Sequence, residues 1–271
     1  MRTTLIKITT LGSLVLLLGL QSCKKETDPK YTEQTSFNNS SVVQLYMAMQ
    51  NANRNYLHVD NKPVNGASIV TGAVFPAVTP GFAVEGGFRA FLLRDTLTAT
   101  TQTPLSFAEN MQVNKRYTIF VYDTITAPKQ KTLETNIVVP TDNSARLRFA
   151  NFVYSPTAIP AVDIFSKKQN ATIFTNVQIS EATSFITIPS GITDTFYIRS
   201  TGTGTNLQNY RQCNPTAYID IIAILTPQAK RSYTLVFRGG YRASNLFTSC
   251  PSSGAPPPNP SLRQLSVFTN Y

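Results

Sequence analysis

An alternation of apolar and basic side chains runs through Ala145-Arg146-Leu147-Arg148-Phe149-Ala150-Asn151. Successive side chains of a β-strand point to opposite faces of the sheet, so Leu147 and Phe149 share one face and Arg146 and Arg148 share the other. The pattern predicts a strand with one face in a core and the other in water. We expect Arg146 and Arg148 to be solvated or to cap a sheet edge, rather than to bind a ligand.

Short runs of the same kind, separated by Gly, Pro and Asn, occupy the chain from residue 41 onward. They are rich in Val, Ile, Tyr, Phe and Thr, which favour strands, and no segment keeps a helical period over three turns. The sequence therefore predicts an all-β protein. The expected strands are Val42–Ala48, Asn55–Val59, Ser68–Phe75, Gly87–Arg94, Arg116–Asp123 and Leu133–Val139, followed by Ala145–Val153, Ala161–Ser166, Ala171–Ile179, Ser184–Ile188, Thr193–Ser200, Ala217–Leu225, Ser232–Arg238 and Leu262–Phe268.

The two halves of this pattern resemble each other. Three segments recur in the same order and at similar spacing, and a repeat of roughly 100 residues built from short strands is typical of tandem β-sandwiches. We predict two immunoglobulin-like antiparallel β-sandwich domains, residues 41–140 and 145–271. The alternative is one large β-domain with chance similarity. The matched segments are Val43–Tyr46 with Leu147–Ala150, Phe91–Thr96 with Phe196–Thr201, and Lys115–Val121 with Lys230–Phe237.

The second copy carries two insertions, residues 202–215 and 239–261, each with one cysteine. A disulfide between Cys213 and Cys250 would join them, and closing a loop of roughly 38 residues stabilises by about 3–4 kcal/mol in the chain-entropy model. The alternative is two buried free thiols. Long loops often carry binding function, so Tyr210, Tyr241 and Phe247 are the candidate ligand-binding residues. Their alternative role is to pack the loops down.

The amino terminus predicts export and lipid anchoring. A positive start and an apolar run ending at Leu20 are typical of an export signal, and about ten apolar residues are too few to span a bilayer. The sequence Leu20-Gln21-Ser22-Cys23 resembles the lipobox of bacterial lipoproteins. The resemblance implies cleavage before Cys23, a diacylglycerol on its sulfur and an acyl chain such as palmitate on its amine. The alternative is an ordinary signal peptide with a chance cysteine.

The lipobox resemblance predicts a lipoprotein signal peptide over residues 1–22, followed by a lipidated cysteine and a flexible polar tether over residues 23–40. Two or three acyl chains are enough for stable anchoring to a membrane. Lys24–Asp28 resembles the surface-export signals of Bacteroidota lipoproteins. The alternative is that these charges only solvate the tether.

The second copy also resembles domain-of-unknown-function family 4397. Members begin with an "A-x-L-R-F-x-N" strand, matched by Ala145–Asn151, and continue through "P-A-V-D-V-Y", matched by Pro160–Phe165. The match is good from residue 145 to about 200. In the first half, Leu57–Asp60 stands where the "VD" strand is expected, but without the preceding Pro-Ala. The resemblance implies tandem β-sandwiches in exported, lipid-anchored bacterial proteins, and it brings no catalytic residues.

The sequence offers little for catalysis or for metal and cofactor binding. His58 is the one histidine, no G-x-S-x-G elbow accompanies a serine, and no calcium loop is present. Asp60 and Asp163 are interpreted as equivalent structural residues that accept backbone hydrogen bonds. The net charge of +10 falls to +8 without the signal peptide, because Arg2 and Lys7 leave with it. The basic residues are scattered, so we expect no nucleic-acid partner.

These observations favour a non-enzymatic protein of the cell envelope, anchored by lipid to the outer membrane and exposed at the surface or facing the periplasm. Its role would be structural or binding. One alternative is glycan or adhesin-type binding through the second-domain loops. Another is an accessory role with an envelope protein as partner. A glycoside hydrolase, or an accessory to one, is the remotest alternative.

Overall fold

The computed structural model describes residues 37–78, 81–135, 137–211, 214–242, 259 and 261–270. Over these residues the protein is all-β with β-sandwich architecture, which confirms the predicted fold class. Its one helical element is a short 3-10 turn, η1 (Phe37–Asn39). No helix in the described part is long and apolar enough to cross a membrane. The predicted signal peptide, Cys23 and most of the tether lie outside the described residues.

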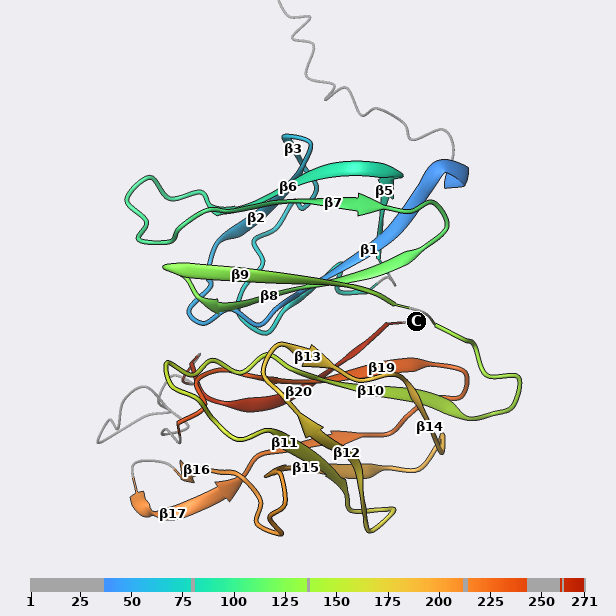
Figure 1. Ribbon diagram of the computed structural model, residues 1–271, viewed down its shortest axis with the longest axis vertical. Coiled ribbons are helices and arrows are strands. Elements are labelled where there is room, and N and C mark those ends of the chain that lie inside the picture. Colours follow the sequence, from blue (N-terminus) through green and yellow to red (C-terminus); the bar gives the residue numbers. More distant parts are fainter. Residues whose placement is uncertain are drawn as a thin grey trace, which may run out of the picture. The chain divides into compact units, whose positions relative to one another are not determined.

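The first sandwich consists of two sheets that enclose a core (Figure 1). One has the order β4-β1-β8-β9, with β5 also pairing with β1, and the other has the order β3-β2-β6-β7. Leu45, Leu57, Phe91 and Ile119 are fully buried between them. The strands are β1 (Ser40–Met47), β2 (Asn55–Val59), β3 (Lys62–Pro63), β4 (Val74–Phe75), β5 (Phe82–Glu85), β6 (Gly87–Asp95), β7 (Leu105–Met111), β8 (Arg116–Thr124) and β9 (Ala127–Glu134).

The second sandwich repeats this arrangement and adds a hairpin (Figure 1). One sheet has the order β13-β10-β19-β20, with β14 on β10, and the other has the order β12-β11-β15-β18. Leu147, Phe149, Ile164 and Phe196 are buried in its core. The strands are β10 (Ala145–Asn151), β11 (Val162–Ser166), β12 (Ala171–Val177), β13 (Glu181–Ala182), β14 (Ile186–Ile188), β15 (Asp194–Ser200), β16 (Gln208–Arg211), β17 (Asn214–Asp220), β18 (Ile222–Leu225), β19 (Ser232–Arg238) and β20 (Gln264–Thr269).

Each sandwich contains one parallel strand pair, although its other pairings are antiparallel. β1 lies parallel to β8, and β10 lies parallel to β19. Parallel neighbours need a long crossover connection, and here nearly a whole copy of the repeat separates the two strands. The first strand of each copy thereby becomes a central strand, because it also pairs with two short strands on its other side.

The registers align the two copies residue by residue along these strands. Val43 lies opposite Tyr117, and Leu147 lies opposite Tyr233. Each tyrosine hydroxyl accepts a hydrogen bond from the backbone N–H five residues earlier, at 3.1 Å for Tyr117 and 3.0 Å for Tyr233. Gln44 of the first copy therefore occupies the position that Arg148 occupies in the second.

A third apolar cluster joins the two sandwiches. It lies between the sheet of β1 and β8 and the sheet of β10 and β19. The rings of Phe120 and Phe152 stack with centroids 4.4 Å apart, and those of Tyr46 and Phe268 stack at 5.0 Å. The sandwiches therefore share an apolar core in addition to their own cores. Burial of aromatic surface of this kind is a strong driving force for association.

Polar contacts across this interface follow an approximate twofold relation. Asn270 Nδ2 donates to Gln44 Oε1 at 3.2 Å. On the other side Arg148 Nη2 donates to Thr135 Oγ1 at 3.4 Å. Arg148 is the equivalent of Gln44. Thr135 is the equivalent of Asn270, because the N–H of Thr135 donates to the carbonyl of Arg116, just before Tyr117, and the N–H of Asn270 donates to that of Ser232, just before Tyr233. The repeats therefore meet in the self-complementary way that two identical subunits would use.

Candidate functional site

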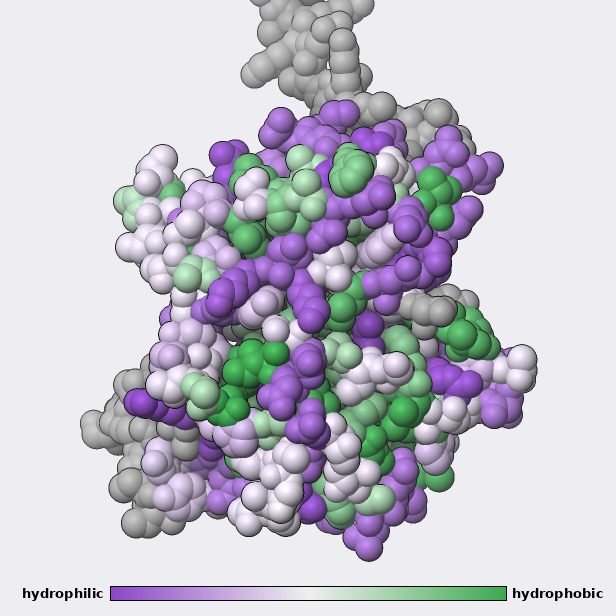
Figure 2. Space-filling model, in the orientation of Figure 1, coloured by the Kyte–Doolittle hydropathy of each residue, from purple (hydrophilic) through white to green (hydrophobic). Residues whose placement is uncertain are grey.

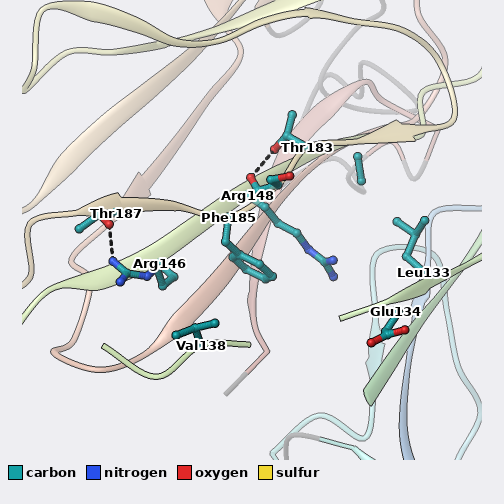
Figure 3. Close-up of a pocket in the computed structure, with 10 residues that line it drawn as sticks. Leu133, Glu134, Val138, Arg146, Arg148, Thr183, Phe185 and Thr187 are labelled. Atoms are coloured by element: carbon teal, nitrogen blue, oxygen red, sulfur yellow. Dashed lines mark hydrogen bonds between the residues drawn. The ribbon is translucent and has the colours of Figure 1, made fainter. Parts of the chain in front are cut away.

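A groove of about 610 Å³ lies where the two sandwiches meet (Figure 3). Its walls come from β9, the connection between the sandwiches, β10 and the segment around β13 and β14. Figure 2 shows the surface hollowed along this junction, with hydrophilic residues beside the hollow. A second hollow of about 460 Å³ continues along β9 and β12. The first groove is lined by Leu133, Glu134, Val138, Arg146, Arg148, Ala182, Thr183, Ser184, Phe185 and Thr187.

Arg148 lies at the base of the groove, and its burial contradicts the prediction of a solvated side chain. Only 3% of the residue is exposed. Nε donates to Thr234 Oγ1 at 2.8 Å and Nη2 donates to Thr118 Oγ1 at 3.0 Å. The prediction was wrong because the outer face of β10 is covered by the other sandwich, which supplies Thr118.

The guanidinium of Arg148 is surrounded by hydroxyls and rings. Its central carbon lies 4.8 Å from the ring centroid of Phe185 and 5.9 Å from that of Phe120. Among the described residues, no carboxylate lies within 4 Å of Arg148. Burial lowers the pKa of Arg148 from its ordinary value to about 10, so the side chain keeps its charge at neutral pH.

Arg146 follows the expectation of a solvated side chain more closely. It is half-buried, and its Nη1 donates to Ser144 Oγ and to Thr187 Oγ1 at the groove wall (Figure 3). Figure 3 shows the two guanidinium groups on opposite sides of Phe185. Arg146 and Arg148 are two residues apart on one face of β10, so both contribute charge to the same groove.

The acidic residue of the groove is already paired with a base outside it. Glu134 Oε1 accepts from Lys115 Nζ at 2.7 Å, and both side chains are well exposed. In the adjoining hollow, Lys131 Nζ donates to the carbonyl of Ser180 at 2.8 Å. The groove therefore combines the guanidinium groups of two arginines with hydroxyl groups and an apolar wall formed by Leu133, Val138 and Phe185.

The residues predicted to bind a ligand do not gather around this groove. Tyr210 lies in the β16–β17 hairpin and packs on Tyr218, with ring centroids 5.3 Å apart. Tyr241 packs against the core of the second sandwich, and its N–H donates to the carbonyl of Tyr154 at 2.7 Å. Phe247 lies outside the described residues. Tyr241 therefore packs onto the second sandwich and Tyr210 packs within its own hairpin, and the ligand-binding role of both stays a prediction.

Arg263 connects the two insertions of the second copy. It is buried, its Nε donates to Asn209 Oδ1 of the hairpin at 3.3 Å, and its Nη1 donates to the carbonyl of Tyr241. Asn209 Nδ2 donates back to the carbonyl of Arg263 at 2.8 Å. Cys213 and Cys250 lie outside the described residues, so the predicted disulfide between the same two insertions stays a prediction.

Asp60 and Asp163 both accept backbone hydrogen bonds, as predicted. Asp60 Oδ1 accepts from the N–H of Ala90 at 3.0 Å, and Asp163 Oδ1 accepts from that of Asn176 at 2.7 Å. Their predicted equivalence is wrong. Asp163 lies opposite Arg199, and Tyr56 lies opposite Arg94, which is the equivalent of Arg199 in the first copy. Asp163 therefore corresponds to Tyr56 and not to Asp60.

The described residues assemble no cluster of metal-ligating side chains. They contain no group of three His, Cys, Asp or Glu side chains that could hold a metal ion. His58 lies half-buried in β2, and its Nδ1 has no hydrogen-bond partner within the described part of the chain. The groove itself offers cationic and hydroxyl donors, which suit binding of a negatively charged group.

Sequence reasoning missed the groove, although it singled out the two arginines. The missing information was that β9 of the first sandwich and the Ala182–Thr187 segment of the second would lie beside β10. Comparison with known proteins adds no family or relative: no protein-family model matches the chain, and no match is found among curated proteins.

Proposed function

We propose that the chain is a non-enzymatic, lipid-anchored protein of the bacterial cell envelope, in which two β-sandwiches act as one binding module. The observation that supports a single module is the shared aromatic cluster of Tyr46, Phe120, Phe152 and Phe268. Because these rings are buried, separating the sandwiches would expose a large apolar surface to water. A rigid pair can present a groove of fixed shape, whereas two freely tethered domains cannot.

The anchored location rests on Leu20-Gln21-Ser22-Cys23 and the polar stretch that follows. The test is metabolic labelling of the full chain with palmitate in a Gram-negative host. We expect label in the wild type and in Cys250→Ser, and neither label nor membrane retention in Cys23→Ser. Labelling that survives Cys23→Ser would overturn the lipid anchor. Digestion by protease on intact cells would then distinguish a surface-exposed module from one that faces the periplasm.

The disulfide between Cys213 and Cys250 is part of this proposal. The contacts of Arg263 with Asn209 and Tyr241 support it, because they link the described part of the first insertion to the start of the second. Export to an oxidising compartment would favour the bond. Mass spectrometry of the non-reduced protein should find one peptide pair joined through these cysteines. Two free thiols in the exported protein would refute this part.

A further inference from the structure

The approximate twofold relation shows that docking of the sandwiches does not need a charge at position 148. At the equivalent position, Gln44 is 3% exposed and crosses the interface with a neutral amide. Its Nε2 donates to the carbonyl of Thr269, and its Oε1 accepts from Asn270, which is the counterpart of the contact between Arg148 and Thr135. A buried, unpaired charge is costly, and a neutral side chain of similar size usually serves stability better. Arg148 is therefore more strongly charged than its docking role requires.

Three further features of the groove, Arg146, Thr187 and Phe185, have no counterpart on the symmetry-related side of the interface. Strand registers pair Arg146 with Thr187 in the second copy and Val42 with Ala83 in the first. By the same registers, Phe185 of the groove corresponds to Gly81. The symmetry-related position therefore carries Val42, Gln44, Gly81 and Ala83, and it lacks both cations, the ring and the hydroxyl. The chemistry of the groove is specific to the second copy.

Part of the hydrogen-bonding capacity of the two arginines is unused. A guanidinium has five N–H donors, and Arg148 uses Nε and Nη2 on three threonine hydroxyls. No described residue accepts from its Nη1, and none accepts from Nε or Nη2 of Arg146. Figure 3 shows the Arg148 guanidinium pointing past Phe185 toward β9, into the groove.

We propose that this groove binds the oxyanion of a small ligand, a carboxylate or a sulfate or phosphate ester, through the N–H donors that Arg148 and Arg146 leave unused. Planar guanidinium groups match such anions with paired, charge-assisted hydrogen bonds. The apolar wall of Leu133, Val138 and Phe185 would hold the body of the ligand, and the groove is large enough for a sugar ring. An acidic sugar and a free inorganic anion share this chemistry, and the experiment separates them.

The inference goes beyond the proposed anchored role and is independent of the lipid. The test is isothermal titration of the full chain, purified from membranes in detergent, at constant ionic strength. The probes are sodium glucuronate, sodium sulfate, sodium acetate and neutral glucose. We expect saturable binding of at least one anion and none of glucose. Tighter binding of glucuronate than of acetate and sulfate would identify an acidic sugar, and comparable binding of all three would identify the oxyanion alone.

The variants place the binding site. Arg146→Gln, which changes a half-buried side chain, should lower the affinity for the anion about ten- to hundredfold, the usual effect of losing a charge-assisted hydrogen bond. Arg148→Lys keeps the positive charge but removes the planar guanidinium group, and it should lower the affinity for the anion by a similar factor. Arg94→Gln, on the exposed face of β6, is the matched control and should bind as the wild type does. Absence of saturable binding by any anion, or equal affinity in Arg146→Gln and Arg94→Gln, would overturn the proposal.

Discussion

Tyr117 and Tyr233 show how a single side chain fixes the end of a loop in both copies. Each ring is buried, and each hydroxyl accepts from the N–H of the residue five positions earlier, Gln112 or Gln228. Those N–H groups precede β8 and β19, where no strand partner takes them up. The same hydrogen bond therefore recurs at the same register in both repeats.

Removal of this hydroxyl should destabilise the fold. In Tyr233→Phe the N–H of Gln228 loses its acceptor, and the loss of a typical intramolecular hydrogen bond costs about 0.5–1.5 kcal/mol. Urea unfolding should show the loss as a lower midpoint with an unchanged slope. Tyr197→Phe is the matched control, since no described residue hydrogen-bonds to the Tyr197 hydroxyl, and it should change the free energy of unfolding by less than about 0.5 kcal/mol. Equal losses in the two variants would contradict this account.

Asp95 should make stability depend on pH in the acid range. The N–H of Leu97 holds the pKa of Asp95 below its usual 3.8, and the hydroxyl of Thr100 and the Arg54 guanidinium act in the same direction. Because the folded state favours the carboxylate, this stabilisation is complete above the unfolded pKa and disappears as the pH falls through the lower folded value. Asp95→Asn should therefore be less stable than the wild type at pH 6, and the difference should shrink below about pH 4. The measurement is urea unfolding across this range, and a constant difference would refute the assignment.

At the level of elements, β1 and β10 hold the sheets together, because each is paired on both sides. Leu147 of β10 is fully buried in the second core, so Leu147→Ala should lower the free energy of unfolding by about 2–5 kcal/mol. Ile224 lies on the edge strand β18 and is 60% exposed, so Ile224→Ala should change it by less than about 0.5 kcal/mol. Denaturant unfolding of both variants checks the contrast. Similar effects at the two sites would contradict the burial of Leu147 in the core of the second sandwich.

Two strands whose bounds the sequence predicted to the residue lie in the interior of their sheets. The bounds of β2 and β19 agree with the predicted Asn55–Val59 and Ser232–Arg238. β7 was missed and β9 was placed six residues too late, at Leu133 instead of Ala127. Both are edge strands, and β9 carries Lys129, Lys131 and Pro128, residue types that protect edges from pairing with other chains. Such strands carry little hydrophobic signal, so a pattern search passes over them.

The candidate site was less predictable than the fold for a different physical reason. Alternation in β10 correctly placed Arg146 and Arg148 on one face, but it could not show what covers that face. Two of the three hydroxyls that bind Arg148 come from Thr118 and Thr135 of the other sandwich, and a ring beside it comes from Phe185. Contacts between distant segments depend on how two sheets dock, which is not encoded in the period of either strand.

At the level of the whole molecule, the repeat explains both the stability of the interface and the position of the groove. Two copies of one unit meet face to face, and the equivalent positions are filled by Gln44 on one side and Arg148 on the other. A tandem arrangement lets the two sides diverge, because a substitution in one copy changes one side only. An identical-subunit dimer would carry the same chemistry twice. The groove is thus a feature that fusion of the two copies permits.

The shared aromatic cluster should make the two sandwiches unfold together. We expect the mature chain to show a single transition by differential scanning calorimetry. Phe152 is fully buried and packs on Phe120 of the other sandwich, so Phe152→Ala should weaken the interface by about 3–5 kcal/mol and split the transition in two. Phe174→Ala is the matched control, since this ring lies in the core of the second sandwich alone. Because the interface still couples the two sandwiches in this variant, it should lower the melting temperature without dividing the transition. Two transitions in the wild type would contradict a rigid module.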